Sequence, residues 1–134
     1  TGRALITAEG DQADIEVHQI TAANGMEKVI AATVVHYIND SLGDMAKIGT
    51  SDYSEKDHNK HWAEMKGYAI GLQTSPFKLI SDSQLRELAG TMGTAPVYAE
   101  PGSSDYNTAV ANLNRARDVL QDAYGFAAAD VANW

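Results

Sequence analysis

The stretch YNTAVANLNRARDVLQDAYG, residues 106–125, carries the most regular pattern in this chain of 134 residues. The residues that recur at alternating steps of four and three are Tyr106, Val110, Leu113, Arg117, Leu120 and Tyr124. This period places them on one face of an α-helix, and the alanines beside them favour a helix further. Gly125 is typical of a left-handed residue that ends a helix. The stretch therefore predicts one long amphipathic helix that ends near Tyr124.

The first third of the chain has a similar but less regular period, from about Leu5 to Ile48. The residues that mostly fit one helical face are Ile15, Ile20, Met26, Ile30, Val34, Tyr37, Ser41, Met45 and Ile48. Gly25 interrupts this pattern, because glycine either ends a helix or marks a kink within one. We expect a single long helix with a disturbance at Gly25.

Two further helices are predicted between these segments. Ser54 is a suitable N-cap for the first, and Ser81, three residues before Gln84, has the spacing of a capping box for the second. The apolar stripe of the first of these helices consists of Trp62, Met65, Ala69 and Leu72. Gly67 and Gly71 lie four residues apart on the same helix, so we expect a neighbouring helix to approach closely there.

No stretch predicts a β-strand, so the fold class is all-α. We expect residues 1–134 to form a single domain, an antiparallel helical bundle of three to four main helices. The chain begins at Thr1, without an initiator methionine, and opens directly into helical sequence. We therefore expect it to be one portion of a longer helical protein.

Composition excludes several classes of function. The formal net charge is −8, and the ten basic residues are scattered, which disfavours a nucleic-acid partner. The absence of cysteine excludes thiol catalysis, zinc-thiolate sites and iron–sulfur clusters in this chain. The longest apolar run, residues 29–35, is far too short for a transmembrane segment.

The strongest hint of chemistry lies in the segment DHNKHWAEMKGYAIGL, residues 57–72. His61 and Glu64 are three residues apart, so both project from nearly the same side of a helix. Imidazole and carboxylate are good ligands for first-row transition metals. The residues expected to complete a metal site are His58, one turn earlier, and His36 or Asp40 on the first helix. The competing interpretation is a core helix whose polar residues are solvated.

Catalysis has weaker support in the sequence. The serines lie at predicted caps and loops, and none sits in a strand–turn–helix elbow. Thr1 has the position of an N-terminal threonine nucleophile, whose own amine would act as the base. No sheet that would support such an enzyme is predicted. We therefore expect no catalytic residue and a protein that is not an enzyme.

Three stretches resemble the C-terminal half of a bacterial domain family of unknown function that occurs in secreted, lipoprotein-like proteins. They are EKVIAATVVHYIND (27–40), KHWAEMKGYAIGLQTSP (60–76) and LNRARDVLQDAYGFAAADVANW (113–134). More loosely, the chain is similar to the imelysin-type helical proteins, whose motif is Gly-x-His-x-x-Glu. His61 and Glu64 match that motif, whereas Asn59 stands in the glycine position.

The resemblance implies an extracytoplasmic address, in the periplasm or at the cell surface of a bacterium, and an N-terminal half that is the partner of this one. It also implies binding of a metal ion, iron or zinc, or of an iron-containing ligand for uptake. In that hypothesis His61 and Glu64 are metal ligands, completed by His36 or His58. The alternative is a structural or interaction module, which predicts an apolar stripe left exposed on one helix.

Overall fold

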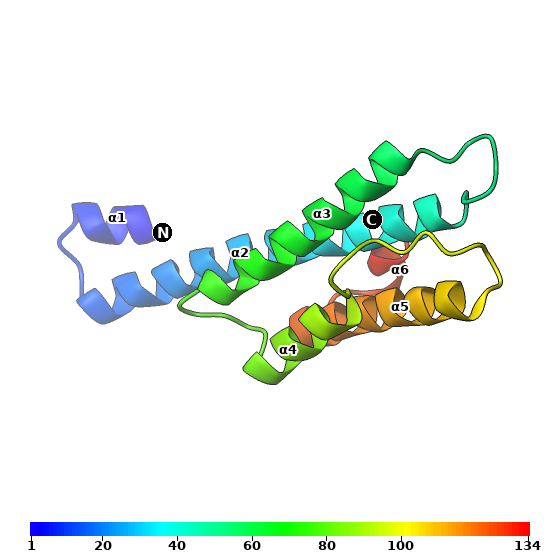
Figure 1. Cartoon of the computed structure of the whole chain (residues 1–134). Helices are drawn as coiled ribbons and strands as arrows, with labels where there is room; N and C mark the ends of the chain where they lie inside the picture. The colour runs from blue at the N-terminus through cyan, green and yellow to red at the C-terminus, as the bar shows by residue number, and fades with distance from the viewer.

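The computed structural model describes residues 1–134 and contains helices but no strands (Figure 1). Its elements are α1 (Gly2–Thr7), α2 (Gln12–Met45), α3 (Glu55–Gly71), the 3-10 turn η1 (Leu72–Thr74), α4 (Asp82–Thr91), α5 (Ser104–Tyr124) and α6 (Ala128–Val131). The predicted all-α class is confirmed; the chain has six α-helices, of which α1 and α6 are only 6 and 4 residues long, and the bundle of three to four main helices stays a prediction. None of them has both the length and the apolar character that crossing a membrane requires.

The 34-residue helix α2 organises the molecule. Helix α3 runs back along the second half of α2, and α5 packs against the same half from another side (Figure 1). Helix α4 packs mainly on α5, and α6 closes against α2 and α5. The first half of α2 extends beyond this bundle as an arm, on which α1 folds back (Figure 1). We call α1 and residues 12–26 of α2 the arm.

One face of α2 supplies much of the core. Its buried positions follow alternating steps of four and three residues, Glu27, Ala31, Val34, Ile38, Ser41 and Met45, and Ile48 continues these steps in the turn after the helix. The sequence correctly assigned Val34, Met45 and Ile48 to this face. Met26 was assigned wrongly, because its side chain is 71% exposed and the neighbouring Glu27 occupies the buried position.

Local sequence signals fix most helix ends. The predicted N-caps Ser54 and Ser81 accept hydrogen bonds from backbone N–H groups of their helices, as does Ser103 at the start of α5, and the capping box of α4 is complete. The expected disturbance at Gly25 is wrong, since α2 runs through it without a break. The chain instead turns between α1 and α2, where Glu9 has a φ of 52°.

The close approach expected at Gly67 and Gly71 is also wrong. A Cβ atom built on either glycine would meet no heavy atom within 4 Å. Gly67 faces solvent, so no packing reason for a glycine exists at this helix-interior position. Its flexibility therefore weakens α3 without a compensating contact.

Two glycine substitutions are expected to change stability in opposite directions. Gly125 ends α5 with a φ of 65°, so Gly125→Ala should lower the free energy of unfolding by about 1 kcal/mol. Gly67→Ala should raise it by up to about 1 kcal/mol, because alanine favours the helix and meets no neighbour. Urea denaturation of both variants checks this, and a loss of stability in Gly67→Ala would contradict it.

Candidate functional site

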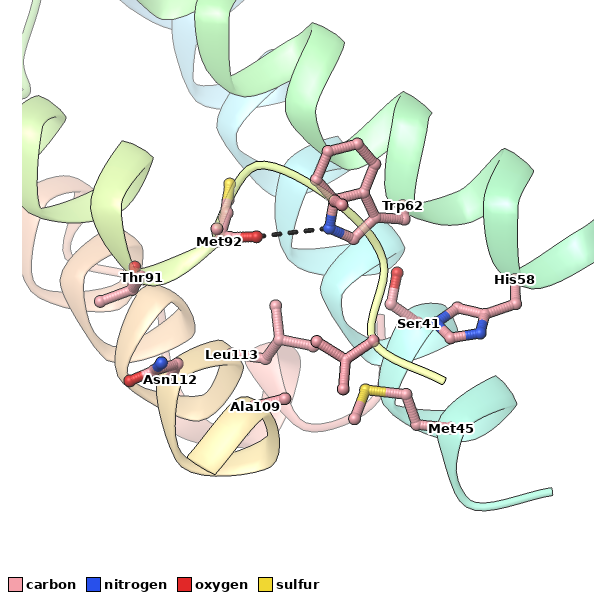
Figure 2. A pocket seen from close by; sticks show the side chains of 12 residues that line it. Ser41, Met45, His58, Trp62, Thr91, Met92, Ala109, Asn112 and Leu113 are labelled. Atoms are coloured by element: carbon pink, nitrogen blue, oxygen red, sulfur yellow. Dashed lines mark hydrogen bonds between the residues drawn. The ribbon is translucent and has the colours of Figure 1, made fainter. Parts of the chain in front are cut away.

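The four predicted metal ligands do not form one site. His36 lies on α2, and His61 on α3 faces it across the helix pair, with Asp40 between them. His58 instead points into a cavity on another flank of α3 (Figure 2). No group of three or more His, Asp or Glu side chains is arranged to hold a metal ion. Metal binding therefore stays a prediction.

A polar seam joins α2 to α3 at the centre of this helix pair. His61 Nδ1 lies 2.6 Å from Asp44 Oδ2 and donates its proton to that carboxylate. His61 Nε2 is 3.9 Å from Asp40 Oδ2, which is also 3.3 Å from His36 Nε2. The sequence predicted that His36 and Asp40 would lie opposite His61. It missed Asp44, the strongest partner of His61, although Asp44 lies one helical turn after Asp40.

Glu64 lies near the seam but makes no hydrogen bond or ion pair with its residues. The nearest cation is Lys60, whose Nζ lies 3.8 Å from Glu64 Oε2 in a partly exposed pair. The ring of Tyr37 stacks on both His61 and Tyr68. Burial, together with the Glu64 carboxylate, raises the pKa of Tyr37. The contacts between α2 and α3 account for the placement of His61, whereas Glu64 Oε2 is a buried atom without a hydrogen-bond partner.

His58 belongs to a separate cavity of about 70 Å³ that lies between α2, α3, α5 and the segment after α4 (Figure 2). Its side chain is 1% exposed, and Nδ1 lies 3.0 Å from the hydroxyl of Tyr53. The rings of Tyr53 and Tyr98 meet the imidazole edge-on. Burial lowers the pKa of His58, against a smaller opposing effect of Asp44, so this histidine is neutral near pH 7.

The arm carries an apolar face that no helix covers. The core stripe of α2 continues upstream of Glu27 at the same steps through Asn24, Ile20, Val17 and Ala13. Helix α1 packs along this part of α2, and residues of the η1 turn lie near Ala23 and Met26 at its end (Figure 1). Val17 is 61% exposed, and Ile20 is half-buried. The alternative interpretation of the sequence predicted such an exposed stripe on one helix.

The arm is also acidic and rich in exposed apolar side chains. Three of the chain's eight exposed large apolar residues lie in the arm: Ile6, Val17 and Met26. Residues 1–26 contain four carboxylates, Glu9, Asp11, Asp14 and Glu16, but no lysine and one arginine, Arg3. An exposed apolar face flanked by charges of one sign is typical of a protein interaction surface.

Comparison with known proteins adds no family to this description. No protein-family model matches the chain, and neither a curated protein nor a solved structure matches it. The resemblance to lipoprotein-type and imelysin-like domains therefore stays a prediction.

Proposed function

We propose that this chain is a non-enzymatic interaction module, and that its arm binds an amphipathic helix of a partner protein that carries basic residues. The observation that carries the proposal is the continuity of the α2 stripe. The same alternating steps that bury Ala31, Val34 and Ile38 in the bundle continue through Ile20 and Val17, where no helix covers them.

A helix is the kind of partner that this face suits. Within the bundle the stripe is covered by α5, which ends at Tyr124 beside Glu27. Residues spaced by four and three on one helix form the ridges and grooves into which a second helix packs. A partner helix that lies along residues 13–24 of α2 would continue the layer that α5 begins.

Charge favours a basic partner over a second copy of the chain. Two copies would bring together two arms that each carry four carboxylates and a single arginine, within chains of net charge −8. Like charges facing each other across an interface oppose association. Lysine or arginine residues at the flanks of a partner helix would instead pair with Asp14 and Glu16.

The first test uses two designed helical peptides with the same leucine face, one with flanking lysines and one with flanking glutamates. In ¹H–¹⁵N spectra, the lysine peptide is expected to shift the amides of residues 13–24 with saturation. Val17→Ser combined with Ile20→Ser should weaken this binding about tenfold or more, since each change removes buried apolar area. Ile70→Ser is the matched control, because Ile70 is 56% exposed but lies on α3. Its effect should stay within about twofold.

Three outcomes would overturn the proposal. The first is the absence of saturable binding of the lysine peptide. The second is equal binding of the two peptides, because it would remove the role of charge. The third is a reversible dimer in sedimentation equilibrium that Val17→Ser dissociates, because the occupant of the face would then be a second copy.

A further inference from the structure

We propose that the cavity beside His58 binds a small neutral molecule that carries a hydroxyl or amide group. This site lies in the bundle, away from the arm, so it does not depend on the proposed function above. Four features restrict the ligand: two buried polar groups, a lining without charged residues, a small volume, and a wall formed by the segment that follows α4.

Two polar groups in the cavity have hydrogen-bonding capacity left over. Ser41 is fully buried, and its Oγ has no hydrogen-bond partner. His58 uses Nδ1 for the hydroxyl of Tyr53, which leaves Nε2, and its ring points toward Ser41 (Figure 2). A buried hydroxyl without a partner is unfavourable, so a guest that both donates and accepts would satisfy both groups at once.

The lining favours a neutral guest with an apolar part. Among the twelve residues around the cavity there is no Asp, Glu, Lys or Arg. The low pKa of His58 keeps its imidazole uncharged near pH 7. A charged guest would lose its hydration without gaining a counter-charge. Trp62, Met45 and Leu113 provide apolar contact around the two polar groups (Figure 2).

The volume limits the guest to a few non-hydrogen atoms. The cavity measures about 70 Å³. A cavity of roughly 150 Å³ accommodates benzene, whereas one water takes up about 30 Å³ of the liquid. A molecule of about four non-hydrogen atoms, such as a short alcohol or a primary amide, therefore fits this site better than an aromatic ring does.

The segment that follows α4 forms one wall of the cavity and is tied to α3. Trp62 Nε1 donates to the carbonyl oxygen of Met92 at 3.3 Å (Figure 2). Beyond Met92 the chain turns at Gly93, which has a φ of 68°, and Ala95 and Val97 continue the wall. This hydrogen bond holds the wall in place, so the cavity exists before a ligand arrives, as is usual for small-molecule sites.

The experiment titrates propan-2-ol, acetate and benzyl alcohol into protein labelled at the methionine methyl groups. Met45 and Met92 line the cavity, whereas Met65 lies in the core elsewhere and Met26 is exposed on α2. Propan-2-ol is expected to shift Met45 and Met92 with saturation in about the millimolar range, the affinity available to so few atoms. Acetate should produce no saturable shift because of its charge, and benzyl alcohol none because of its size.

Two pairs of variants complete the test. Ser41→Ala should weaken binding of propan-2-ol about fivefold, because one hydrogen bond is lost, whereas Ser104→Ala, an exposed serine on α5, should leave it unchanged. Ala109→Leu should abolish binding by filling the cavity, and Ala111→Leu, exposed on the same helix, should not.

Shifts that appear equally at Met26 and Met65, or no saturable shift at all, would mean that the cavity holds only water and would overturn the proposal. Equal binding of acetate would overturn the neutral class of ligand. Binding that Ser41→Ala leaves unchanged would overturn the role of the polar pair.

Discussion

Replacing Tyr124 by phenylalanine is expected to lower the free energy of unfolding by about 2 kcal/mol, because the change removes a hydrogen bond to a buried carboxylate. Glu27 is 3% exposed, and its Oε1 accepts from the Tyr124 hydroxyl at 2.9 Å and from Leu79 N at 2.8 Å. Its Oε2 has no partner. Without the hydroxyl, the carboxylate would keep one hydrogen bond in surroundings that exclude water.

The same tyrosine should make the wild-type protein less stable in alkali. Burial, followed by the hydrogen bond to Glu27, raises the pKa of Tyr124 above its ordinary value of 10.0. Above about pH 10 the unfolded chain therefore loses this proton while the folded chain keeps it, so the stabilisation declines as pH rises. Tyr124→Phe lacks this contribution, and the difference in stability between the two proteins should narrow from pH 9 to pH 11.

Urea denaturation at a series of pH values measures both effects. Tyr106→Phe is the matched control, because Tyr106 is half-buried against the core on the same helix. It should change stability by less than about 0.5 kcal/mol at every pH. A double-mutant cycle with Glu27→Gln should give a coupling energy of about 1 kcal/mol or more with Tyr124→Phe. Additive effects would contradict the pairing of these two residues.

Glu27 also explains why the sequence misplaced the buried face of α2. The spacing of apolar residues predicts that Met26 is buried. The next residue, Glu27, is buried instead, because groups distant in sequence form hydrogen bonds with its carboxylate. Those groups are the hydroxyl of Tyr124, 97 residues away, and the amide of Leu79. Helix ends were easier to predict, because Ser54, Ser81 and Gly125 act on their own helices through neighbouring backbone groups.

The helix break at Glu9 was also missed. Gly25 looked like the weaker point, yet a single glycine inside a helix of 34 residues does not end it, since the flanking turns continue the hydrogen-bonding pattern. The break has a local signal in Asp11, which follows Gly10 and whose side chain accepts a hydrogen bond from Ala13 N at the start of α2. Helix α1 then docks on α2. Gly2 packs against His18 there, and Gly10 against Leu5.

The candidate site was predicted in part. Helical spacing placed His36 and Asp40 on α2 opposite His61 on α3, and their distances agree with this. The same reasoning grouped His58 with His61 because they are three residues apart. Three residues fall about 60° short of a full turn, and that angle turns His58 toward the cavity instead. Tyr53, whose hydroxyl hydrogen-bonds to His58, lies in a loop. A loop has no repeating spacing of residues from which its conformation could be predicted.

Substitution of His61 by alanine is the second change with a large expected effect, a loss of about 2–3 kcal/mol of unfolding free energy. The Asp44 side chain is 8% exposed and would lose the imidazole N–H that lies 2.6 Å from its Oδ2. The Lys47 ammonium lies 3.7 Å from Asp44 Oδ1 and is half exposed, so it compensates little for the lost N–H. Removing one partner of a buried hydrogen bond is more destabilising than removing both, because the group that remains is left without a partner.

His36→Ala is the matched control, because it removes the same type of side chain from the same seam. His36 and Asp40 are 50% and 36% exposed, and such pairs contribute little, so we expect a loss below about 0.5 kcal/mol. The double variant Asp44→Ala, His61→Ala should be more stable than His61→Ala alone, because the uncompensated carboxylate is gone. Equal losses for His36→Ala and His61→Ala would contradict this account of the seam.

The same variants separate a structural role of His61 from the predicted metal role. A ligand that binds only the folded protein raises its stability in proportion to the logarithm of ligand concentration. A purely structural seam therefore predicts the same loss for His61→Ala in a chelator as in ZnCl₂ or FeCl₂. A metal site predicts that the wild type gains stability with metal and that His61→Ala and His36→Ala both lose this gain. Without metal, His36→Ala should change the unfolding free energy little under both hypotheses. The effect of added metal on the stability of this variant therefore distinguishes a metal site from a purely structural contact between α2 and α3.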